Sequence, residues 1–321
     1  MTKRRAKART KKTTPRKHSS KRMVGVDFGA HSLKLAEVEH GPLGSVVRTF
    51  GVAPYSIDKA GRADLVATLE RLARSAHISS SEVVLTLSET EVCMIATGTS
   101  ADTILQKLNP RLASVAVCWP SDDRLIAIPR WVYDFYHQVI DTAGLKLIGL
   151  QHVSSALGRS VAGDGRVGVL DVGAESTSWF VFDHGELVQR ASLPYGSEAL
   201  TQALALAHGW TRDNGEEHKR RLAGDPRTWP EESTLVMATF LERWWQDLFR
   251  HLAEHPSHLN DLVLVGGGSR LAALREHVFE QLGLMPREWR MPTTTLVAEE
   301  LRPHLEPQLP ILANSLSHLV Y

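Results

Sequence analysis

The chain has 321 residues, of which 43% are hydrophobic and 23% are charged, and its formal net charge is +1. This length suits about two globular domains with cores of their own. Two cysteines in so long a chain argue against a disulfide scaffold and indicate a reducing compartment. No apolar run approaches the roughly 18 residues of a membrane span, and the basic start lacks the apolar segment of a signal peptide. Composition therefore predicts a soluble, cytoplasmic protein.

The positive charge is concentrated at the N-terminus. Residues 1–22 contain eleven Lys or Arg and no acidic residue, so residues 23–321 carry a formal charge of −10. A tract of Lys, Arg, Thr and Ser with almost no apolar residue is expected to be disordered. Its cations, at residues 3–22, would attract an anionic membrane surface or a nucleic acid through counterion release. A solubilising tail is the alternative, and without interleaved aromatic residues we expect no specific nucleic acid partner.

The next stretch, residues 24–43, has a similar counterpart 144 positions later in the chain. Each copy predicts a strand, a tight turn led by Asp-x-Gly, and a second strand that ends at a His-Gly pair. A repeat separated by half a chain predicts two similar α/β domains, each offering one such turn to a shared ligand. The matched residues are Asp27, Gly29, Ala30 and Ser32 in the first copy and Asp171, Gly173, Ala174 and Ser176 in the second.

The first domain is predicted to span residues 23–162, with an inserted subdomain at about 79–130. Apolar periodicity predicts a third strand after the hairpin, then helices alternating with short apolar strands. The aromatic face of the helix near residue 135 is interpreted as core packing. After the hairpin, strands are expected at 45–52, 82–88, 114–119, 124–128 and 145–150, and helices at 64–76, 129–143 and 154–161.

The second domain is predicted to span residues 163–321, with a charged surface insertion at about 211–233. A buried strand is expected at 261–265, and a proline-rich loop at 302–310. The two tryptophans of the longest helix are interpreted as a buried face. Helices are expected from residue 197 onward and at 216–222, 231–255, 271–282 and 311–321.

The two repeated turns carry residues suited to phosphate and magnesium. A strand that ends in Asp-x-Gly presents backbone N–H groups, and glycine lets a phosphate approach closely. A carboxylate at this place would hold Mg²⁺, usually through water, beside the phosphates of ATP. Asp27 and Asp171 are therefore the candidate magnesium residues, and Lys34 is a candidate charge partner for the phosphates. The other candidate phosphate residues are Gly29, Ala30, Ser32, Gly173, Ala174 and Ser176.

A third turn, Gly266-Gly267-Gly268-Ser269, joins a buried strand to a helix. Its lack of side chains lets a flat ring lie against the backbone, and the helix N-terminus favours negative charge. Any one of the three turns is often only a packing device. The three in this order, two of them repeats, indicate a clamp for a nucleotide.

The order of these turns resembles the actin/Hsp70/sugar-kinase superfamily and, within it, the PilM family of actin-like type IV pilus assembly proteins. The resemblance covers nearly all of residues 23–321 and leaves out the basic tail. The similar segments are residues 24–29 with 32–38, 171–174 with 183–188, 193–204, and Ala143-Gly144-Leu145.

The resemblance implies an actin-like ATPase fold of two similar domains, with duplicated ribonuclease-H-like sheets around a nucleotide cleft. It implies an ATP-binding scaffold of type IV pilus or related type II secretion assembly, associated with the inner membrane through its partner. That partner would be a PilN-like bitopic membrane protein, bound through its cytoplasmic N-terminal peptide. The pilus motor ATPases and the platform protein are further candidate partners. Glu216 and Lys219 resemble the family's adenosine-contacting Glu-x-x-Lys.

The sequence also departs from the family pattern. Ala30-His31 stands where the family commonly has two hydroxyl residues, and Glu175 adds negative charge to the second turn. The segment Gln151-His152-Val153-Ser154 contains no acidic residue to act as a general base on water, so no catalytic residue is assigned. We therefore expect weakened nucleotide binding and at most a weak ATPase activity.

Two other functions fit the superfamily. A small-molecule kinase would need a catalytic carboxylate and a polar substrate pocket between the domains, and the sequence shows no signature of either. A filament-forming protein of the FtsA type would end in an amphipathic membrane helix, but residues 311–321 lack the Lys/Arg face of such a helix.

Overall fold

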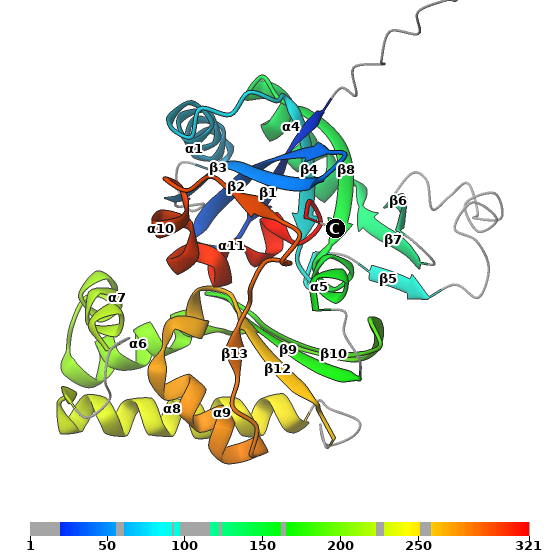
Figure 1. Cartoon of the computed structure of the whole chain (residues 1–321). Coiled ribbons are helices and arrows are strands. Elements are labelled where there is room, and N and C mark those ends of the chain that lie inside the picture. The colour runs from blue at the N-terminus through cyan, green and yellow to red at the C-terminus, as the bar shows by residue number, and fades with distance from the viewer. Residues whose placement is uncertain are drawn as a thin grey trace, which may run out of the picture.

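The computed structural model describes residues 20–55, 61–91, 93–96, 116–121, 124–161, 165–222, 228–250 and 258–320. Two halves, each built on a sheet with helices on its outer face, lie one above the other (Figure 1). Most of the predicted basic tail lies outside the described residues. Lys21 and Arg22, expected in that tail, instead begin the first strand, where Arg22 forms an ion pair with Glu39 of the neighbouring strand at 2.9 Å.

The first sheet has six strands in the order β14-β3-β2-β1-β4-β8. β1, β2 and β3 form an antiparallel meander, and β4 and β8 run parallel to β1. Residues 24–28 of β1 are all buried, as expected for a central strand that is covered on both faces. The strands are β1 (Lys21–Phe28), β2 (Ser32–Gly41), β3 (Gly44–Pro54), β4 (Glu82–Leu87), β8 (Lys146–His152) and β14 (Leu296–Val297).

Two helices, α1 (Gly61–Ser75) and α4 (Arg130–Thr142), cover the outer face of this sheet. Their apolar stripes pack against the side chains of β1, β2 and β4, and Phe135 and Tyr136 of α4 pack against this core, as predicted. The predicted insertion is divided in the structure: β4 belongs to the first sheet, whereas three further strands form a small sheet in the order β5-β7-β6. These are β5 (Cys93–Ala96), β6 (Ala116–Ser121) and β7 (Arg124–Pro129).

The second sheet has the order β11-β10-β9-β12-β13 and repeats the connectivity of the first. β9, β10 and β11 form an antiparallel meander, and β12 and β13 run parallel to β9. The duplication read from the sequence is thus present in the backbone pairing. The strands are β9 (Arg166–Val172), β10 (Thr177–Asp183), β11 (Glu186–Leu193), β12 (Asp261–Val265) and β13 (Arg287–Glu288).

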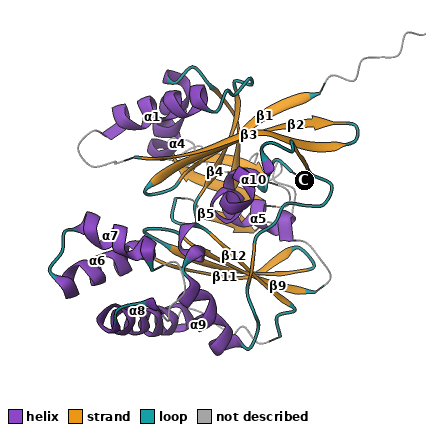
Figure 2. Ribbon diagram, turned by 60° about the vertical axis from the view of Figure 1, so that its left-hand side comes forward, coloured by secondary structure: helices purple, strands orange, loops and turns teal. Residues whose placement is uncertain are grey.

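The helices α6, α8 and α9 cover the outer face of the second sheet, and α7 packs on α6 (Figure 2). Trp244 and Trp245 of α8 are buried in this core, as the sequence indicated. The helix expected at residue 216 begins four residues earlier, where Thr211 accepts a hydrogen bond from the N–H of Asn214 as its N-cap. The helices are α6 (Ser197–His208), α7 (Arg212–Arg221), α8 (Glu231–Arg250) and α9 (Ala272–Leu282), and the short 3-10 helix η2 is Gly267–Arg270.

A third core lies between the two sheets and contains α5 (Val153–Val161) and α11 (Leu309–Leu316). The prediction of a loop at 302–310 is wrong. This segment contains α10 (Arg302–Leu305), η3 (Glu306–Gln308) and the first turn of α11. The C-terminal segment also crosses the expected domain division, since β14 pairs with β3 and α11 lies against β1.

Gly25 of β1 explains how α11 approaches so closely. A Cβ atom added to Gly25 would lie 1.9 Å from the backbone oxygen of Ser315. The strand therefore needs a glycine where the helix backbone rests on it. Within the described residues, no helix is both long and apolar enough to cross a membrane.

Candidate functional site

The three turns singled out in the sequence meet between the two halves. Each follows a central strand: β1, β9 or β12. The second and third turns are in contact, because a Cβ added to Gly266 would lie 2.6 Å from Oδ1 of Asp171. The first turn reaches the second through His31, whose Nε2 lies 3.7 Å from Oε1 of Glu175. The structure thus brings the predicted phosphate, magnesium and adenosine turns to one place.

In the first turn, the carboxylate of Asp27 is paired with a fixed cation. Lys34 is the cross-strand neighbour of Asp27, and its Nζ donates a hydrogen bond to Oδ2 at 3.0 Å. Gly29 makes this pair possible, since an added Cβ would lie 2.2 Å from Nζ of Lys34. The hydroxyl of Tyr55 donates to the carbonyl of Gly29 and so fixes the turn. Burial, followed by the charge of Asp27, raises the pKa of Tyr55, so this hydroxyl keeps its proton.

In the second turn, Asp171 has no such cation. Its cross-strand neighbour is Ser178, and its carboxylate accepts a hydrogen bond from Nδ2 of Asn314 at 3.1 Å. Burial raises the pKa of Asp171; the charge of Asp27 adds to this rise, while Asn314 and Lys34 oppose it. Asp27 and Lys34 of the first sheet are thus close enough to Asp171 of the second sheet to influence its pKa.

The second turn also caps helix α6. The N–H groups of Ser197 and Glu198 donate to the carbonyls of Gly173 and Ala174, at 3.0 and 2.8 Å. These bonds satisfy two of the free N–H groups at the helix start. Gly196 allows the contact, because an added Cβ would lie 2.4 Å from the carbonyl oxygen of Gly173. The turn is therefore rigidly attached to α6.

The third turn presents bare backbone. Gly266 has a φ of +83°, a conformation that favours glycine, and its N–H donates to the carbonyl of Pro310 at 2.9 Å. A Cβ added to Gly267 would meet nothing within 4 Å, so this position is open. Gly268 instead packs on Val172, and Ser269 donates its hydroxyl to the carbonyl of Gly266 at 2.7 Å.

Glu216 and Lys219 lie on the face of α7 that packs against α6. Nζ of Lys219 is 2.6 Å from Oε2 of Glu216 and donates to the carbonyl of Ser197 at 3.1 Å. Burial alone would raise the pKa of Glu216, but its bonds to Lys219, Thr201 and Arg220 lower it below the usual value. Since Ser197 is bound to the second turn, this pair is connected to the cleft through one residue.

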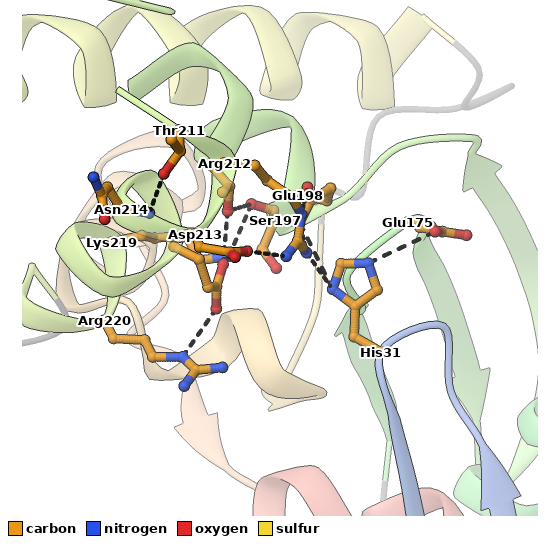
Figure 3. Close-up of polar contacts among 12 residues, drawn as sticks. His31, Glu175, Ser197, Glu198, Thr211, Arg212, Asp213, Asn214, Lys219 and Arg220 are labelled. Atoms are coloured by element: carbon orange, nitrogen blue, oxygen red, sulfur yellow. Dashed lines mark hydrogen bonds and ion pairs between the residues drawn. The ribbon is translucent and has the colours of Figure 1, made fainter. Parts of the chain in front are cut away.

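Four side chains form a polar bridge over the first turn, and none of them was predicted as a site residue from the sequence (Figure 3). Arg212 donates from Nε and Nη2 to the two carboxylate oxygens of Glu198, at 2.7 and 2.8 Å. The same Nη2 lies 3.2 Å from Nδ1 of His31. Glu175 lies on the other side of the imidazole ring. The sequence placed His31 and Glu175 in the turns, but their pairing with Arg212 and Glu198 depends on how α6 and α7 fold back.

The comparisons with known proteins can now be placed beside this geometry. Residues 140–288 match the family model described as type IV pilus assembly protein PilM. The structure is similar to that of a PilM-PilN type IV pilus biogenesis complex, with a TM-score of 0.74, 19% identity and coverage of 92% of this chain and 96% of that chain. Over residues 140–288 the chain is similar to the PilM family. This confirms the resemblance inferred from its motifs.

Other solved structures share the fold of this PilM-like chain. Ethanolamine utilization protein EutJ from Carboxydothermus hydrogenoformans has a TM-score of 0.61 and 17% identity, with 94% of this chain and 90% of that chain covered. MreB 5 of Spiroplasma citri bound to AMPPNP has a TM-score of 0.55 and 10% identity, with 91% and 94% covered. The predicted actin-like ATPase fold is therefore confirmed. No curated protein matches the sequence.

The residues where the three turns meet fit a magnesium nucleotide. No group of three or more His, Cys, Asp and Glu among the described residues could hold a metal alone. Magnesium, however, is commonly bound by one or two carboxylates together with substrate phosphates and waters. Asp27 and Asp171 provide two carboxylates, and Oδ1 of Asn314 is a buried acceptor without a hydrogen-bond partner in the described part of the chain. The donor set therefore suits an ion that arrives with phosphates.

Gln151, at the end of β8, is a further polar residue near the first turn, and it was not assigned as a site residue from the sequence. Thr86 of β4 lies between Asp27 of β1 and Gln151 of β8 in the backbone register. Nε2 of Gln151 is buried and has no hydrogen-bond partner among the residues described. Strand register could have found this residue, since the carboxyl ends of adjacent parallel strands meet at one edge. It is an amide, so the expected absence of an acidic general base remains a prediction.

Proposed function

We propose that this PilM-like chain is an ATP-binding scaffold of type IV pilus assembly, or of a related type II secretion system, that binds the N-terminal cytoplasmic peptide of a PilN-like membrane protein. The convergence of three backbone turns between two similar halves is the observation that carries the nucleotide part. The match over residues 140–288 and the fold shared with a PilM-PilN complex support the pilus part.

In this proposal, the two repeated turns hold phosphates and magnesium from opposite sides. Asp27 and Asp171 hold Mg²⁺, which supplies positive charge next to the phosphate oxygens. Lys34 pairs with Asp27 and adds a second positive charge. The remaining phosphate residues are Gly29, Ala30, Ser32, Gly173, Ala174 and Ser176, and the adenosine residues are Glu216, Lys219, Gly266, Gly267, Gly268 and Ser269.

A ligand that contacts both halves stabilises one angle between them, to the extent that it binds that arrangement better. Here the first turn belongs to the first sheet and the other two turns to the second. The division that we propose, residues 23–162 and 163–321, places α5 and α11 at the joint, where both helices pack in the core between the sheets. Nucleotide would thereby adjust the surface that the partner peptide recognises.

We propose that ATP acts mainly as a conformational ligand and is hydrolysed slowly or not at all. Proton abstraction from water requires a group with a pKa suited to the task. The amide of Gln151 can orient water by hydrogen bonding but cannot take its proton. The proposed location is the cytoplasmic face of the inner membrane, reached through the PilN-like partner. Motor ATPases, the platform protein and anionic lipid bound by residues 3–22 are further proposed contacts.

The test uses the full chain and a synthetic peptide with the N-terminal cytoplasmic sequence of the PilN-like protein from the same organism. Titration calorimetry should show binding of ATP with Mg²⁺, and a change in peptide affinity of severalfold when ATP is present. Phosphate release should stay near background. If the protein binds neither ATP nor the peptide, the proposal is overturned. Rapid phosphate release would overturn the part in which ATP acts as a conformational ligand.

A further inference from the structure

The bridge over the first turn differs from the other contacts of the cleft because its members come from both halves. His31 belongs to the first turn, whereas Arg212 begins α7 and Glu198 lies in the first turn of α6. Figure 3 shows the imidazole of His31 between Glu175 on one side and the Arg212–Glu198 pair on the other. The bridge thus joins the two halves next to the proposed phosphate site.

The distances indicate which nitrogen of the His31 imidazole accepts a hydrogen bond. Nδ1 of His31 lies 3.2 Å from Nη2 of Arg212 and 3.6 Å from Oε2 of Glu198. A guanidinium nitrogen is only a donor, so at 3.2 Å Nδ1 must accept. Nε2 is the ring nitrogen on the side of Glu175. At 3.7 Å the contact with Glu175 is too long for a hydrogen bond. His31 is therefore held by Arg212 more firmly than by Glu175.

Arg212 retains donor capacity beyond its pair with Glu198. The guanidinium has five N–H groups, and the fork to Glu198 uses two of them. Among the described residues Nη1 reaches only Asp213, at 3.4 Å, and the side chain of Asp213 is 91% exposed. The side chain of Arg212 is itself 49% exposed. A second anion can therefore bind Arg212 without breaking its bonds to Glu198, and Glu198 fixes the direction of the guanidinium.

We propose that Arg212, with the ring of His31, binds the phosphate chain of a nucleoside triphosphate, and that Glu198 positions Arg212 for this contact. This inference rests on the proposed nucleotide site and adds a phosphate-specific cation that the repeated turns do not contain. It also accounts for Ala30, because donors from α7 replace the hydroxyl that the first turn lacks. Glu175 opposes the phosphates and swings away, which its 65% exposed side chain permits.

The test compares Arg212→Ala with Arg221→Ala in the full chain. Both arginines lie on α7, but Arg221 is 73% exposed and pairs with Glu217 along the helix surface. Fluorescence titration is carried out with ATP and with adenosine, each in the presence of Mg²⁺. Loss of a charge-assisted contact should weaken ATP binding by roughly tenfold to a hundredfold in Arg212→Ala. Adenosine binding, and all binding by Arg221→Ala, should change less than about threefold.

Glu175→Gln supplies an opposite expectation. Removing a negative charge near the phosphates should tighten ATP binding severalfold and leave adenosine unaffected. The inference is overturned if Arg212→Ala binds ATP like the unmodified protein, or loses ATP and adenosine equally, which would indicate a general loss of structure. If the unmodified protein binds ATP but Glu175→Gln weakens it, the charge argument fails. If the unmodified protein binds no ATP, the proposed function itself fails.

Discussion

The two repeated turns occupy equivalent positions in their sheets, but only the first has a lysine facing its aspartate. In the first, Asp27 faces Lys34 across the strand pair; in the second, Asp171 faces Ser178 at the equivalent register. The first carboxylate is therefore neutralised by a fixed ammonium group. The second is desolvated, and burial raises its pKa. Duplication supplied the geometry, and the substitution of one cross-strand residue made the two sides of the cleft chemically different.

This difference makes the two sides of the site favour groups of opposite charge. An ion or ligand with positive charge is favoured next to Asp171, where no side-chain cation faces the carboxylate across the strands. A phosphate is favoured next to Lys34 of the first turn, and next to Arg212 if our inference is correct. A symmetric clamp with two lysines would hold phosphate from both sides but would pair both carboxylates with ammonium groups, which weakens their attraction for magnesium. The asymmetry therefore suits a magnesium nucleotide better than an exact repeat would.

Substitution of a glycine at each turn should give the largest difference in stability between the two turns. A Cβ on Gly196 would meet three backbone carbonyl oxygens of the second turn, the nearest at 2.4 Å, whereas a Cβ on Gly29 would meet mainly the mobile end of Lys34. Gly196→Ala should lower the free energy of unfolding by about 3 kcal/mol, because backbone cannot give way. Gly29→Ala should cost less, about 1–2 kcal/mol, because the Lys34 side chain can shift, although this shift weakens its bond to Asp27.

Urea denaturation of both variants measures this difference. Gly29→Ala is the matched control, since it adds the same methyl group to the other turn. Equal losses of stability in the two variants would show that the second turn is not the more rigid of the two.

Lys34→Met tests the ion pair that the second turn lacks. The side chains of Lys34 and Asp27 are 13% and 12% exposed, so loss of the ammonium leaves a largely buried, unpaired carboxylate. The free energy of unfolding should fall by about 2–3 kcal/mol. The double variant Asp27→Asn with Lys34→Met should recover about half of this loss, because no charge is left unpaired. A double variant less stable than Lys34→Met would contradict the electrostatic explanation.

A largely buried histidine of the C-terminal segment, His318, should make the stability of the chain depend on pH. His318 lies beside Thr86 of β4, 3.2 Å between Nδ1 and Oγ1, and burial lowers its pKa to about 3. An unfolded chain protonates this histidine below about pH 6.5, while the folded chain does not until about pH 3. The free energy of unfolding should therefore fall with decreasing pH within this window, by up to about 1.4 kcal/mol per pH unit.

Between pH 7 and pH 5 this amounts to about 2 kcal/mol. His318→Gln keeps a neutral polar side chain and cannot be protonated, so its loss of stability over the same range should be smaller by that amount. Denaturation curves at the two pH values supply the comparison. If both proteins lose stability equally, His318 does not control the acid sensitivity of the joint between C-terminal segment and first sheet.

The sequence was sufficient for the parts of the fold that depend on local pattern. Two strands with an Asp-x-Gly turn, repeated at a fixed distance, predicted the two sheets and the residues at their strand ends. It was not sufficient for Asn314, because a residue in the last helix reaches Asp171 only when α11 packs on β1. Proline-rich composition also misled, since the prolines of residues 302–310 lie in the first turns of short helices, where proline is tolerated.

The same limit applies to the candidate site. Asp27, Lys34 and the glycines follow from strand and turn chemistry. Arg212 and Glu198 could not be assigned, because their pairing requires α7 to fold back on α6 next to the first turn. Long-range contacts of this kind leave no periodic signal in the sequence.

The smallest effect, and the one that most directly tests the asymmetry, is a reversal of sign. A carboxylate whose pKa is raised in the folded state reduces stability at neutral pH, so Asp171→Asn should raise the free energy of unfolding by about 1 kcal/mol or leave it unchanged. Asp27→Asn should lower it by about 1 kcal/mol, because the bond to Lys34 loses its charge. Both should weaken ATP binding in the presence of Mg²⁺. If both variants are destabilised alike, the two aspartates sit in equivalent environments, and the asymmetry of the cleft must come from α7 alone.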